Sequence, residues 1–349
     1  MKAFREVVSL LLPLLLASCA GSGSMVFSNV EKAGAFPEQH DLKLDESELV
    51  AIDVPGMRSM ISVDSVLMAL SSRNDPAVAL FDYRTLESRG KYLRHGNGPA
   101  ELLPFTGPSR SNSLLRYSGD SLYMDVLGVN KDVLRWNVSA AFSDGREEIE
   151  AVPGFKDLKG VPFKWMLNDS TVLCKKLEDN SRRQVRELYV SGKLQPMPNA
   201  AELDAASIET PDDGFLFNVL STMPAYNPER DIIAEASLFL NVVNIYSLHS
   251  DFRKSVVLGK SVPVRKVEKD FKATGRMSQS IWACIPCGDC FVLLYGEEGT
   301  EERELLVFDW EGNPVCKYLL HEGVDAIDIN GGTLLTFDSE TETLRRYKL

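Results

Sequence analysis

The chain has 349 residues, 44% of them apolar and 9% aromatic, so it can bury a large core and is long enough for two domains or one repeat fold. Its 38 basic and 50 acidic residues give a formal charge of −12, with no Lys/Arg stripe able to neutralise a phosphate backbone. Nucleic acid is therefore excluded as an expected partner, and anionic lipid surfaces are predicted to be poor ones.

The first residues have the composition of a processing signal. Lys2 and Arg5 precede an apolar run of eleven residues, Val7 to Ala17, which is shorter than the roughly 20 residues needed to span a bilayer. The run ends in Leu-Ala-Ser before Cys19, which resembles a bacterial lipobox. That resemblance implies removal of residues 1–18 as a signal peptide and acylation of Cys19, which would anchor the chain to a lipid bilayer in the cell envelope. The alternative is an ordinary secretory signal with a chance cysteine.

Residues 19–45 are rich in Gly, Ser, Lys, Glu and Asp and contain few large apolar residues. This composition predicts a flexible tether. A folded domain is expected over residues 46–349.

The folded part is predicted to be all-β, because short apolar runs alternate with turn clusters and no stretch shows a helical apolar period over three turns. Six runs carry one aromatic residue at the same place, at intervals of 53 to 62 residues with a last interval of 39. These runs are Leu80-Phe81-Asp82, Arg135-Trp136-Asn137, Leu188-Tyr189-Val190, Ile245-Tyr246-Ser247, Val307-Phe308-Asp309 and Arg346-Tyr347-Lys348.

A second apolar run lies upstream of each aromatic, so two inner strands are visible in each of six units. The runs are Val66 to Leu70, Leu122 to Val126, Thr171 to Cys174, Ile232 to Ala234, Phe291 to Tyr295 and Leu334 to Phe337. The spacing is a little above the roughly 40–50 residues of a propeller blade and predicts a six-bladed β-propeller. A β-sandwich with accidental aromatic spacing is the alternative.

The last unit lacks an outer strand, because only two residues follow Tyr347. Leu49 to Val54 is an unassigned strand upstream of the first unit. We expect it to complete the last blade and close the ring, which removes an exposed sheet edge.

A Gly-Asn-Gly-Pro-Ala-Glu corner, Gly96 to Glu101, follows the first blade. Together with the lipobox and the blade rhythm, it resembles the six-bladed, TolB-like β-propeller lipoproteins of Bacteroidetes over about residues 45 to 349. The resemblance implies the architecture, while activity in that family is mostly unassigned. The corner lacks the third glycine of a dinucleotide-binding motif and the Gly-Lys-Ser/Thr of a phosphate loop, and is predicted to be a tight turn. The alternative is a ligand-binding loop that presents Arg94, His95 and Asn97.

Three cysteines, Cys284, Cys287 and Cys290, resemble a metal or redox motif. A structural metal site needs a fourth ligand, which the sequence does not offer, and a thioredoxin-type motif needs a helix start. The alternatives left open are free thiols, a local disulfide between Cys284 and Cys290, and a metal site. No metal and no cofactor are predicted.

Three Asp-Ser pairs match the O-glycosylation pattern of exported Bacteroidetes proteins, at Ser65, Ser121 and Ser170. Asp and Ser are also common turn residues, which is the alternative explanation.

No catalytic residue is predicted, because the sequence contains neither a nucleophile elbow nor a zinc-protease helix. The favoured hypothesis is an envelope-anchored, non-enzymatic propeller that binds a protein, peptide or glycan. The alternative is a metal-dependent hydrolase or lyase in the central channel, which would require Asp120, Asp169, Asp289 and their neighbours to converge.

Overall fold

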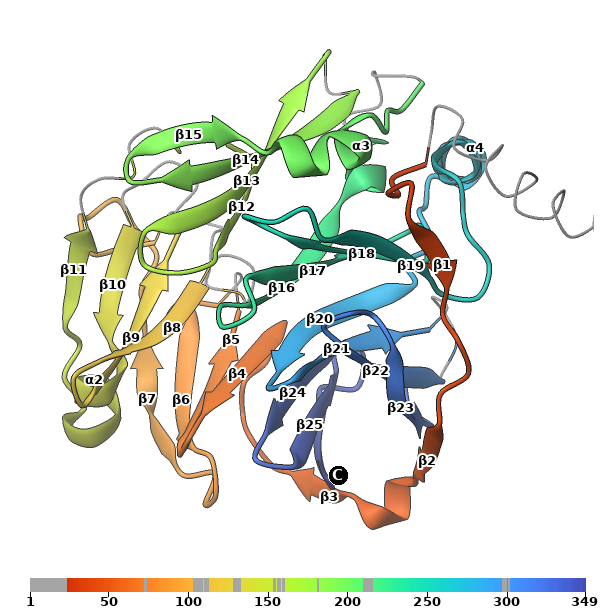
Figure 1. Ribbon diagram of the computed structural model, residues 1–349. Coiled ribbons are helices and arrows are strands. Elements are labelled where there is room, and N and C mark those ends of the chain that lie inside the picture. The colour runs from red at the N-terminus through yellow and green to blue at the C-terminus, as the bar shows by residue number, and fades with distance from the viewer. Residues whose placement is uncertain are drawn as a thin grey trace, which may run out of the picture.

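Six small antiparallel sheets stand in a ring in this computed structural model (Figure 1). The structure describes residues 24–71, 74–102, 109, 113–127, 133–152, 155, 158, 161–180, 182–209, 216–296, 300 and 302–349. The chain is a six-bladed β-propeller, as the sequence predicted.

Each blade contributes consecutive strands, which run from the centre of the ring outwards. Blade 1 contains β4 (Ser59–Val63), β5 (Val66–Leu70), β6 (Val78–Asp82) and β7 (Ser88–Tyr92). Blade 2 contains β8 (Ser113–Ser118), β9 (Ser121–Val126), β10 (Val133–Asn137) and β11 (Ile149–Val152). Blade 3 contains β12 (Phe163–Met166), β13 (Thr171–Glu178), β14 (Arg183–Val190) and β15 (Lys193–Pro196).

The remaining blades follow the same order. Blade 4 contains β16 (Thr222–Asn227), β17 (Ile232–Ser237), β18 (Val242–Ser247) and β19 (Arg253–Val257). Blade 5 contains β20 (Ile281–Cys287), β21 (Cys290–Tyr295), β22 (Arg303–Asp309) and β23 (Pro314–Leu320). Blade 6 contains β24 (Ala326–Asn330), β25 (Thr333–Asp338) and β26 (Thr343–Lys348) from the C-terminus, and an outer strand from the N-terminal side.

The hydrophobic core is divided among the interfaces between neighbouring blades. Each of six apolar clusters joins two adjacent sheets. The six predicted aromatics all lie on the third strand of their blade and are at most 5% exposed: Phe81, Trp136, Tyr189, Tyr246, Phe308 and Tyr347. Burial of an aromatic side chain stabilises a fold strongly, so each blade interface is held by one such residue.

One strand assignment from the sequence is wrong. The apolar runs predicted as the two inner strands of each blade are its second and third strands. The innermost strands are β4, β8, β12, β16, β20 and β24, which border the channel. Their channel-facing edge has no strand partner, so their sequences need not be continuously apolar.

The N-terminal side of the chain closes the ring, as predicted. β3 (Glu48–Val50) pairs antiparallel with β26, with Val50 opposite Leu344, and supplies the outer strand of blade 6. The observed strand is shorter than the predicted run Leu49 to Val54 and begins one residue earlier. The ring is thereby closed between chain segments almost 300 residues apart.

The tether predicted for residues 19–45 is wrong for the residues described, which begin at 24. β1 (Val30–Lys32) pairs parallel with β19, and β2 (Glu38–Leu42) pairs parallel with β23. Residues 24–50, which we call the strap, therefore run along the outer edges of blades 4, 5 and 6 (red to orange in Figure 1). The outer strands of blades 4 and 5 offer unpaired backbone groups, and the strap satisfies them.

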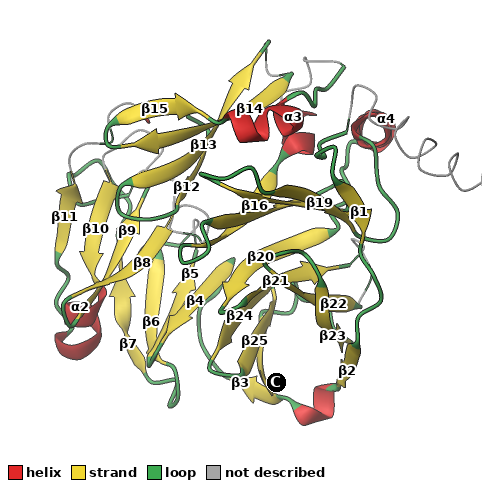
Figure 2. Ribbon diagram, viewed as in Figure 1, coloured by secondary structure: helices red, strands yellow, loops and turns green. Residues whose placement is uncertain are grey.

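Helices are few and lie outside the sheets (Figure 2). Within the described residues they are α2 (Val138–Asp144), α3 (Ala201–Asp204) and α4 (Val264–Thr274), with 3₁₀ turns η2 (Leu44–Glu46), η4 (Pro198–Ala200) and η5 (Leu216–Leu220). The expectation that no stretch is helical over three turns is wrong for α4, which begins after Pro263 and ends at Gly275 in the left-handed conformation. Among the described residues, no helix combines the length and apolar character of a membrane span.

Candidate functional site in the central channel

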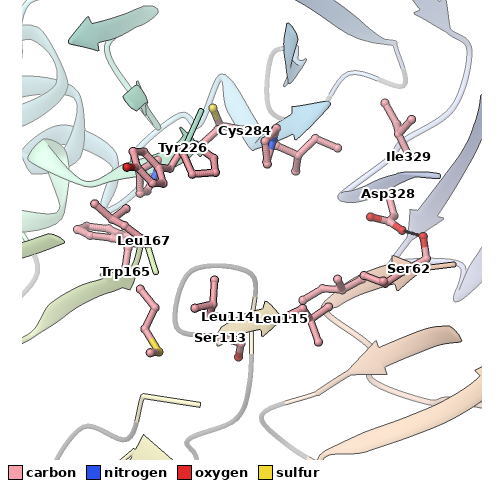
Figure 3. Close-up of a pocket in the computed structure, with 18 residues that line it drawn as sticks. Ser62, Ser113, Leu114, Leu115, Trp165, Leu167, Tyr226, Cys284, Asp328 and Ile329 are labelled. Carbon is pink, nitrogen blue, oxygen red and sulfur yellow. Dashed lines mark hydrogen bonds between the residues drawn. The ribbon is translucent and has the colours of Figure 1, made fainter. Parts of the chain in front are cut away.

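A cavity of about 370 Å³ lies where the innermost strands of all six blades meet (Figure 3). This volume falls within the range of small-molecule sites, roughly 300–1,000 Å³. The lining is mostly apolar: Ile61, Ser62, Val63, Ser113, Leu114, Leu115, Trp165, Met166, Leu167, Pro224, Ala225, Tyr226, Pro228, Cys284, Ile285, Pro286, Asp328 and Ile329.

Two prolines on the wall reflect the position of the inner strands. Pro224 lies on β16 and Pro286 on β20, and both line the channel. Proline cannot donate a backbone hydrogen bond, so within sheets it is confined to edges such as this one. At these two positions the wall offers no N–H to a ligand and is more apolar.

The polar groups of the cavity are few, and the best defined is a buried carboxylate. Asp328 is 2% exposed and accepts a hydrogen bond from the Ser62 hydroxyl across blades 6 and 1. It is the one carboxylate among the described lining residues. It is thus the one buried negative group at the cavity wall in the described part of the chain.

Neither of the two other reactive groups in the lining is activated. Burial, together with the nearby Asp231 carboxylate, raises the pKa of Tyr226 to about 12. Burial also raises the pKa of the Cys284 thiol well above its usual range, and this thiol lies 3.5 Å from the carbonyl oxygen of Ala234. Both side chains are protonated at neutral pH, which disfavours them as a base or a nucleophile.

One of the two ends of the channel is surrounded by acidic side chains. The turn between the first and second strands of a blade emerges at the same end in every blade, and we call this end the acidic rim. Contacts between neighbouring turns confirm the arrangement: the Tyr117 hydroxyl donates to Asp64, and Arg230 lies 3.5 Å from Asp289. Exposed carboxylates come from five of the six turns: Asp64, Asp120, Asp169, Glu229 and Asp289.

A groove leads from the cavity across the acidic rim. It has a volume of about 480 Å³ and shares Tyr226, Pro228 and Pro286 with the channel lining. Trp310 forms part of its wall and donates a 3.1 Å hydrogen bond from Nε1 to the carbonyl oxygen of Gly288. The cavity and the groove together form one continuous surface.

The carboxylates named for a channel enzyme do not converge inside the channel. Asp120, Asp169 and Asp289 lie on exposed turns of the acidic rim, and the Asp289 side chain is 92% exposed. Over the described residues, no three His, Cys, Asp or Glu side chains are grouped as metal ligands.

The loop residues Arg94, His95 and Asn97 lie away from the channel. A blade of four antiparallel strands begins and ends at the same end of the ring, so the loop after β7 lies opposite the acidic rim. Arg94 and Asn97 are exposed, His95 is partly buried, and the His95 backbone N–H donates to Asp75 at 3.0 Å. None of the three lines the cavity.

The corner itself is a turn held by its own glutamate. The Gly98 N–H donates to Glu101 at 2.7 Å, and the Gly96 N–H donates to the Leu102 carbonyl at 2.7 Å. The Glu101 carboxylate lies so close to Gly96 that a Cβ there would overlap it. A side chain at this position would therefore have to displace the Glu101 carboxylate, which also accepts the Gly98 N–H.

The thiols are arranged differently from the predicted pair. Cys287 lies directly opposite Cys290 across the β20–β21 hairpin, whereas Cys284 is opposite Leu293 and buried. The strand register therefore favours Cys287, and not Cys284, as the disulfide partner of Cys290. Cys284 and Cys287 are three residues apart on one strand, which places their side chains on opposite faces of the sheet. The cysteines from Cys174 to Cys316 are all free thiols, and burial raises the pKa of Cys287 and Cys290.

We expect oxidised glutathione to link Cys287 to Cys290, because directly paired residues of a sheet lie within disulfide range, about 5.5 Å between Cα atoms. Peptide mass spectrometry should find this crosslink, with loss of two hydrogens, and an unmodified Cys284. A Cys284–Cys290 crosslink would contradict the assignment. Elemental analysis of the reduced protein should find no stoichiometric zinc or iron.

The three serines of the glycosylation pattern all lie at the acidic rim. Ser65 and Ser170 are exposed turn residues, and Ser121 is the partly buried first residue of β9. Asp64, which precedes Ser65, has φ near 50°, as expected of a turn. The geometry explains the Asp-Ser pairs as turns, and glycosylation stays a prediction.

A second group of titratable side chains, missed by the sequence analysis, is buried between blades 3 and 4. Glu235 accepts from Arg186 at 2.7 and 2.9 Å, from Tyr246 at 2.7 Å and from Thr222 at 2.5 Å. Lys175 lies 3.4 Å from Glu235 and donates to the Leu220 carbonyl at 2.9 Å. A 2.6 Å bond from Arg186 to Asp204 completes a network of two positive and two negative groups. Because the fully buried Arg186, Lys175 and Glu235 have no access to solvent, the network is structural.

The stability of the wild type should rise with pH above neutrality because of Lys175. Burial lowers its pKa from 10.5 to about 7. The nearby Glu235 carboxylate favours the charged form, but this effect is smaller than that of burial, and the positive charge of Arg186 opposes it. Between these two values the unfolded chain binds a proton that the folded chain does not, so folding becomes more favourable as pH rises. Lys175→Met should flatten this rise in denaturant titrations at about pH 7 and about pH 9.5, whereas Lys193→Met at an exposed site should not.

The fold and site define a class: a six-bladed propeller with an apolar channel, an acidic rim and free thiols. No protein-family model and no curated protein matches the sequence. Among solved structures, a member of the DUF4221 family from Bacteroides vulgatus is similar, with a TM-score of 0.51 and 12% identity over 88% of this chain and 98% of that one.

Two further structures are similar over most of their length. A protein from Bacteroides fragilis that its description assigns to export has a TM-score of 0.47 and 10% identity, over 91% of this chain and 98% of its own. The β-propeller domain of Cps50 (Swd1) from Myceliophteria thermophila has a TM-score of 0.41 and 12% identity, over 87% and 99%. The likeness to the Bacteroides vulgatus structure, at 12% identity, shows the fold alone.

Proposed function

We propose that this protein is an envelope-anchored lipoprotein whose propeller binds a ligand, without chemical conversion, at the channel mouth on the acidic rim. The observation that carries the proposal is the channel cavity, whose lining side chains are mostly apolar, together with the groove of mixed polarity that continues from it across the acidic rim. An exported, lipid-anchored protein is what the Leu-Ala-Ser-Cys19 sequence implies. The resemblance of the corner and blade rhythm to TolB-like lipoproteins supports the same assignment.

The lining favours a peptide or protein segment over a glycan. Sugars need many hydrogen-bonding partners, whereas Asp328, Ser62, Ser113 and the Tyr226 hydroxyl are the few polar side-chain groups of the described cavity. An apolar side chain suits a wall of Leu, Ile, Pro and Trp. The surrounding carboxylates attract cationic groups, so basic residues next to the apolar one should strengthen binding.

Fluorescent peptides that differ in one apolar anchor and in flanking Lys or Asp test the binding site. The wild type should bind the Leu/Lys or Phe/Lys peptides saturably, and added salt should weaken this binding. Ile329→Trp fills the cavity and should reduce the affinity at least about tenfold, the effect of roughly 1.4 kcal/mol. Val315→Trp, at an exposed position of β23 far from the channel, is the matched control. Equal binding by Ile329→Trp would place the ligand elsewhere.

The anchor is tested separately. Cys19→Ala should move the protein from the membrane fraction to the soluble fraction and abolish incorporation of labelled fatty acid. A wild type that takes up no label would refute the lipoprotein assignment and leave the channel proposal standing.

A further inference from the structure

A short segment of this acidic protein is strongly basic. Residues 260–276 contain six basic and two acidic residues, although the whole chain carries a formal charge of −12. The basic residues are Lys260, Arg265, Lys266, Lys269, Lys272 and Arg276, and the acidic ones are Glu268 and Asp270. Most of the segment is helix α4 and the turns at its ends.

The positive charges of α4 gather on its outer face. Arg265, Lys269 and Lys272 are exposed and follow the i, i+4, i+7 spacing of one helix face. The opposite face is buried through Val264 and Val267. Arg265 pairs with Glu209 at 2.7 Å, and both side chains of this pair are largely exposed. The fold thus presents a basic stripe to the surroundings.

The start of the strap lies close to helix α4 (Figure 1). Met25 and Phe27 of the strap belong to the same hydrophobic cluster as Val264 and Val267 of α4. Figure 1 shows α4 next to the start of the strap. Cys19 precedes Ser24 by five residues, and an extended chain covers at most about 3.6 Å per residue, so an acyl anchor on Cys19 lies within about 18 Å of Ser24.

We propose that α4 is the membrane-facing surface of the propeller, and that its basic stripe binds the phosphate groups of anionic lipids. The proposal rests on acylation of Cys19 for the position of the bilayer. Charges beyond about 8–10 Å are screened at physiological ionic strength, so the bilayer responds to the sign of α4 rather than to the net charge. Anionic lipid was expected to be a poor partner because of the net charge of the whole chain, but helix α4 is an exception to this expectation.

This placement also orients the channel. α4 belongs to the connection from β19 to β20, the last strand of blade 4 and the first of blade 5, so it lies at the end opposite the acidic rim. With α4 on the membrane, the acidic rim and its groove point away from the lipid phosphates. The basic helix then faces the anionic lipid, and the acidic rim faces away from it. The proposed ligand site stays open.

Vesicle co-sedimentation of the unacylated mature chain, carrying Cys19→Ala, tests the stripe without the anchor. It should bind vesicles of equal phosphatidylcholine and phosphatidylglycerol at low salt, and not vesicles of phosphatidylcholine alone. Combined Arg265→Glu, Lys269→Glu and Lys272→Glu should weaken this binding at least about tenfold, since each basic residue near an anionic surface contributes. The control reverses three exposed charges elsewhere, Arg84→Glu, Lys91→Glu and Lys193→Glu, and should bind like the parent.

The outcomes separate this proposal from the proposed function. Equal loss in the two triple variants, or no binding by the parent, overturns the membrane-facing helix. Binding to heparin without binding to vesicles also overturns it and assigns the stripe to a soluble polyanion. In the acylated protein on vesicles, Lys269 and Lys272 should be protected from an amine-reactive label relative to Lys91 and Lys193. Absence of protection overturns the orientation even if fatty acid is present on Cys19.

Discussion

Glu235→Gln is expected to lower the free energy of unfolding by about 3–5 kcal/mol, the cost of removing one partner from a buried ion pair. The substitution keeps the size of the side chain but removes the negative charge that Arg186 and Lys175 share. Lys175 can release its proton, because its pKa is already lowered to about 7. Arg186 cannot, so a buried guanidinium would be left with Asp204 alone.

A matched control comes from a partly exposed strand pair. Glu304 lies 2.8 Å from Lys317 on neighbouring strands of blade 5, and Glu304→Gln should cost less than about 1 kcal/mol. Urea titration of both variants gives the comparison. Similar losses for Glu235→Gln and Glu304→Gln would show that the buried network does not hold blades 3 and 4 together.

Phe27→Ala is expected to cost about 3–5 kcal/mol, the range for removing a buried phenylalanine ring. Phe27 is 1% exposed and packs edge-on against Tyr246 with 5.8 Å between ring centroids. Its backbone N–H donates to Ser255 at 2.8 Å, and the neighbouring Met25 is also buried. The N-terminal side of the strap is thus part of the core between blades 3 and 4.

Val30→Ala, three residues further along, is the control, because Val30 is 45% exposed and should lose little. Thermal melting of the two variants distinguishes a packed strap from a tether. If residues 19–45 acted as a tether, neither substitution nor deletion of residues 21–40 would change the melting midpoint. The packed strap requires that this deletion lower it.

The repeat architecture was predictable because the second and third strands of several blades are buried on both faces. Their runs are apolar and carry one large aromatic, so β5 and β6 or β21 and β22 stand out in the sequence. The outer strand of blade 6 was predictable because the apolar run Leu49 to Val54 had no other place in the repeat. Helix α4 escaped notice because its apolar face is short and its other face is charged.

The site was much less predictable. The channel is lined by segments such as Ile61 to Val63 and Pro224 to Tyr226, which lie on different blades and share no motif. The innermost strands face the channel along one edge, so they contain both polar and apolar side chains and their hydrophobic periodicity is weak. Prolines at edge positions, Pro224 and Pro286, were the one local signal of a channel wall. Arg94, His95 and Asn97 looked suitable as loop residues, but the direction of the strands places them at the opposite end.

The sequence by itself determined the all-β class, the number of blades and the closure of the ring. These features depend on which runs are apolar and how far apart they lie, and both are local properties of the sequence. The tertiary structure alone decided three further features. It joined six distant edges into one apolar cavity, paired Glu235 with Arg186 across two blades, and bound the strap to outer edges that it meets only after folding. Each depends on contacts between residues far apart in sequence, and a strap of polar composition is ordered by edges that no local pattern reveals.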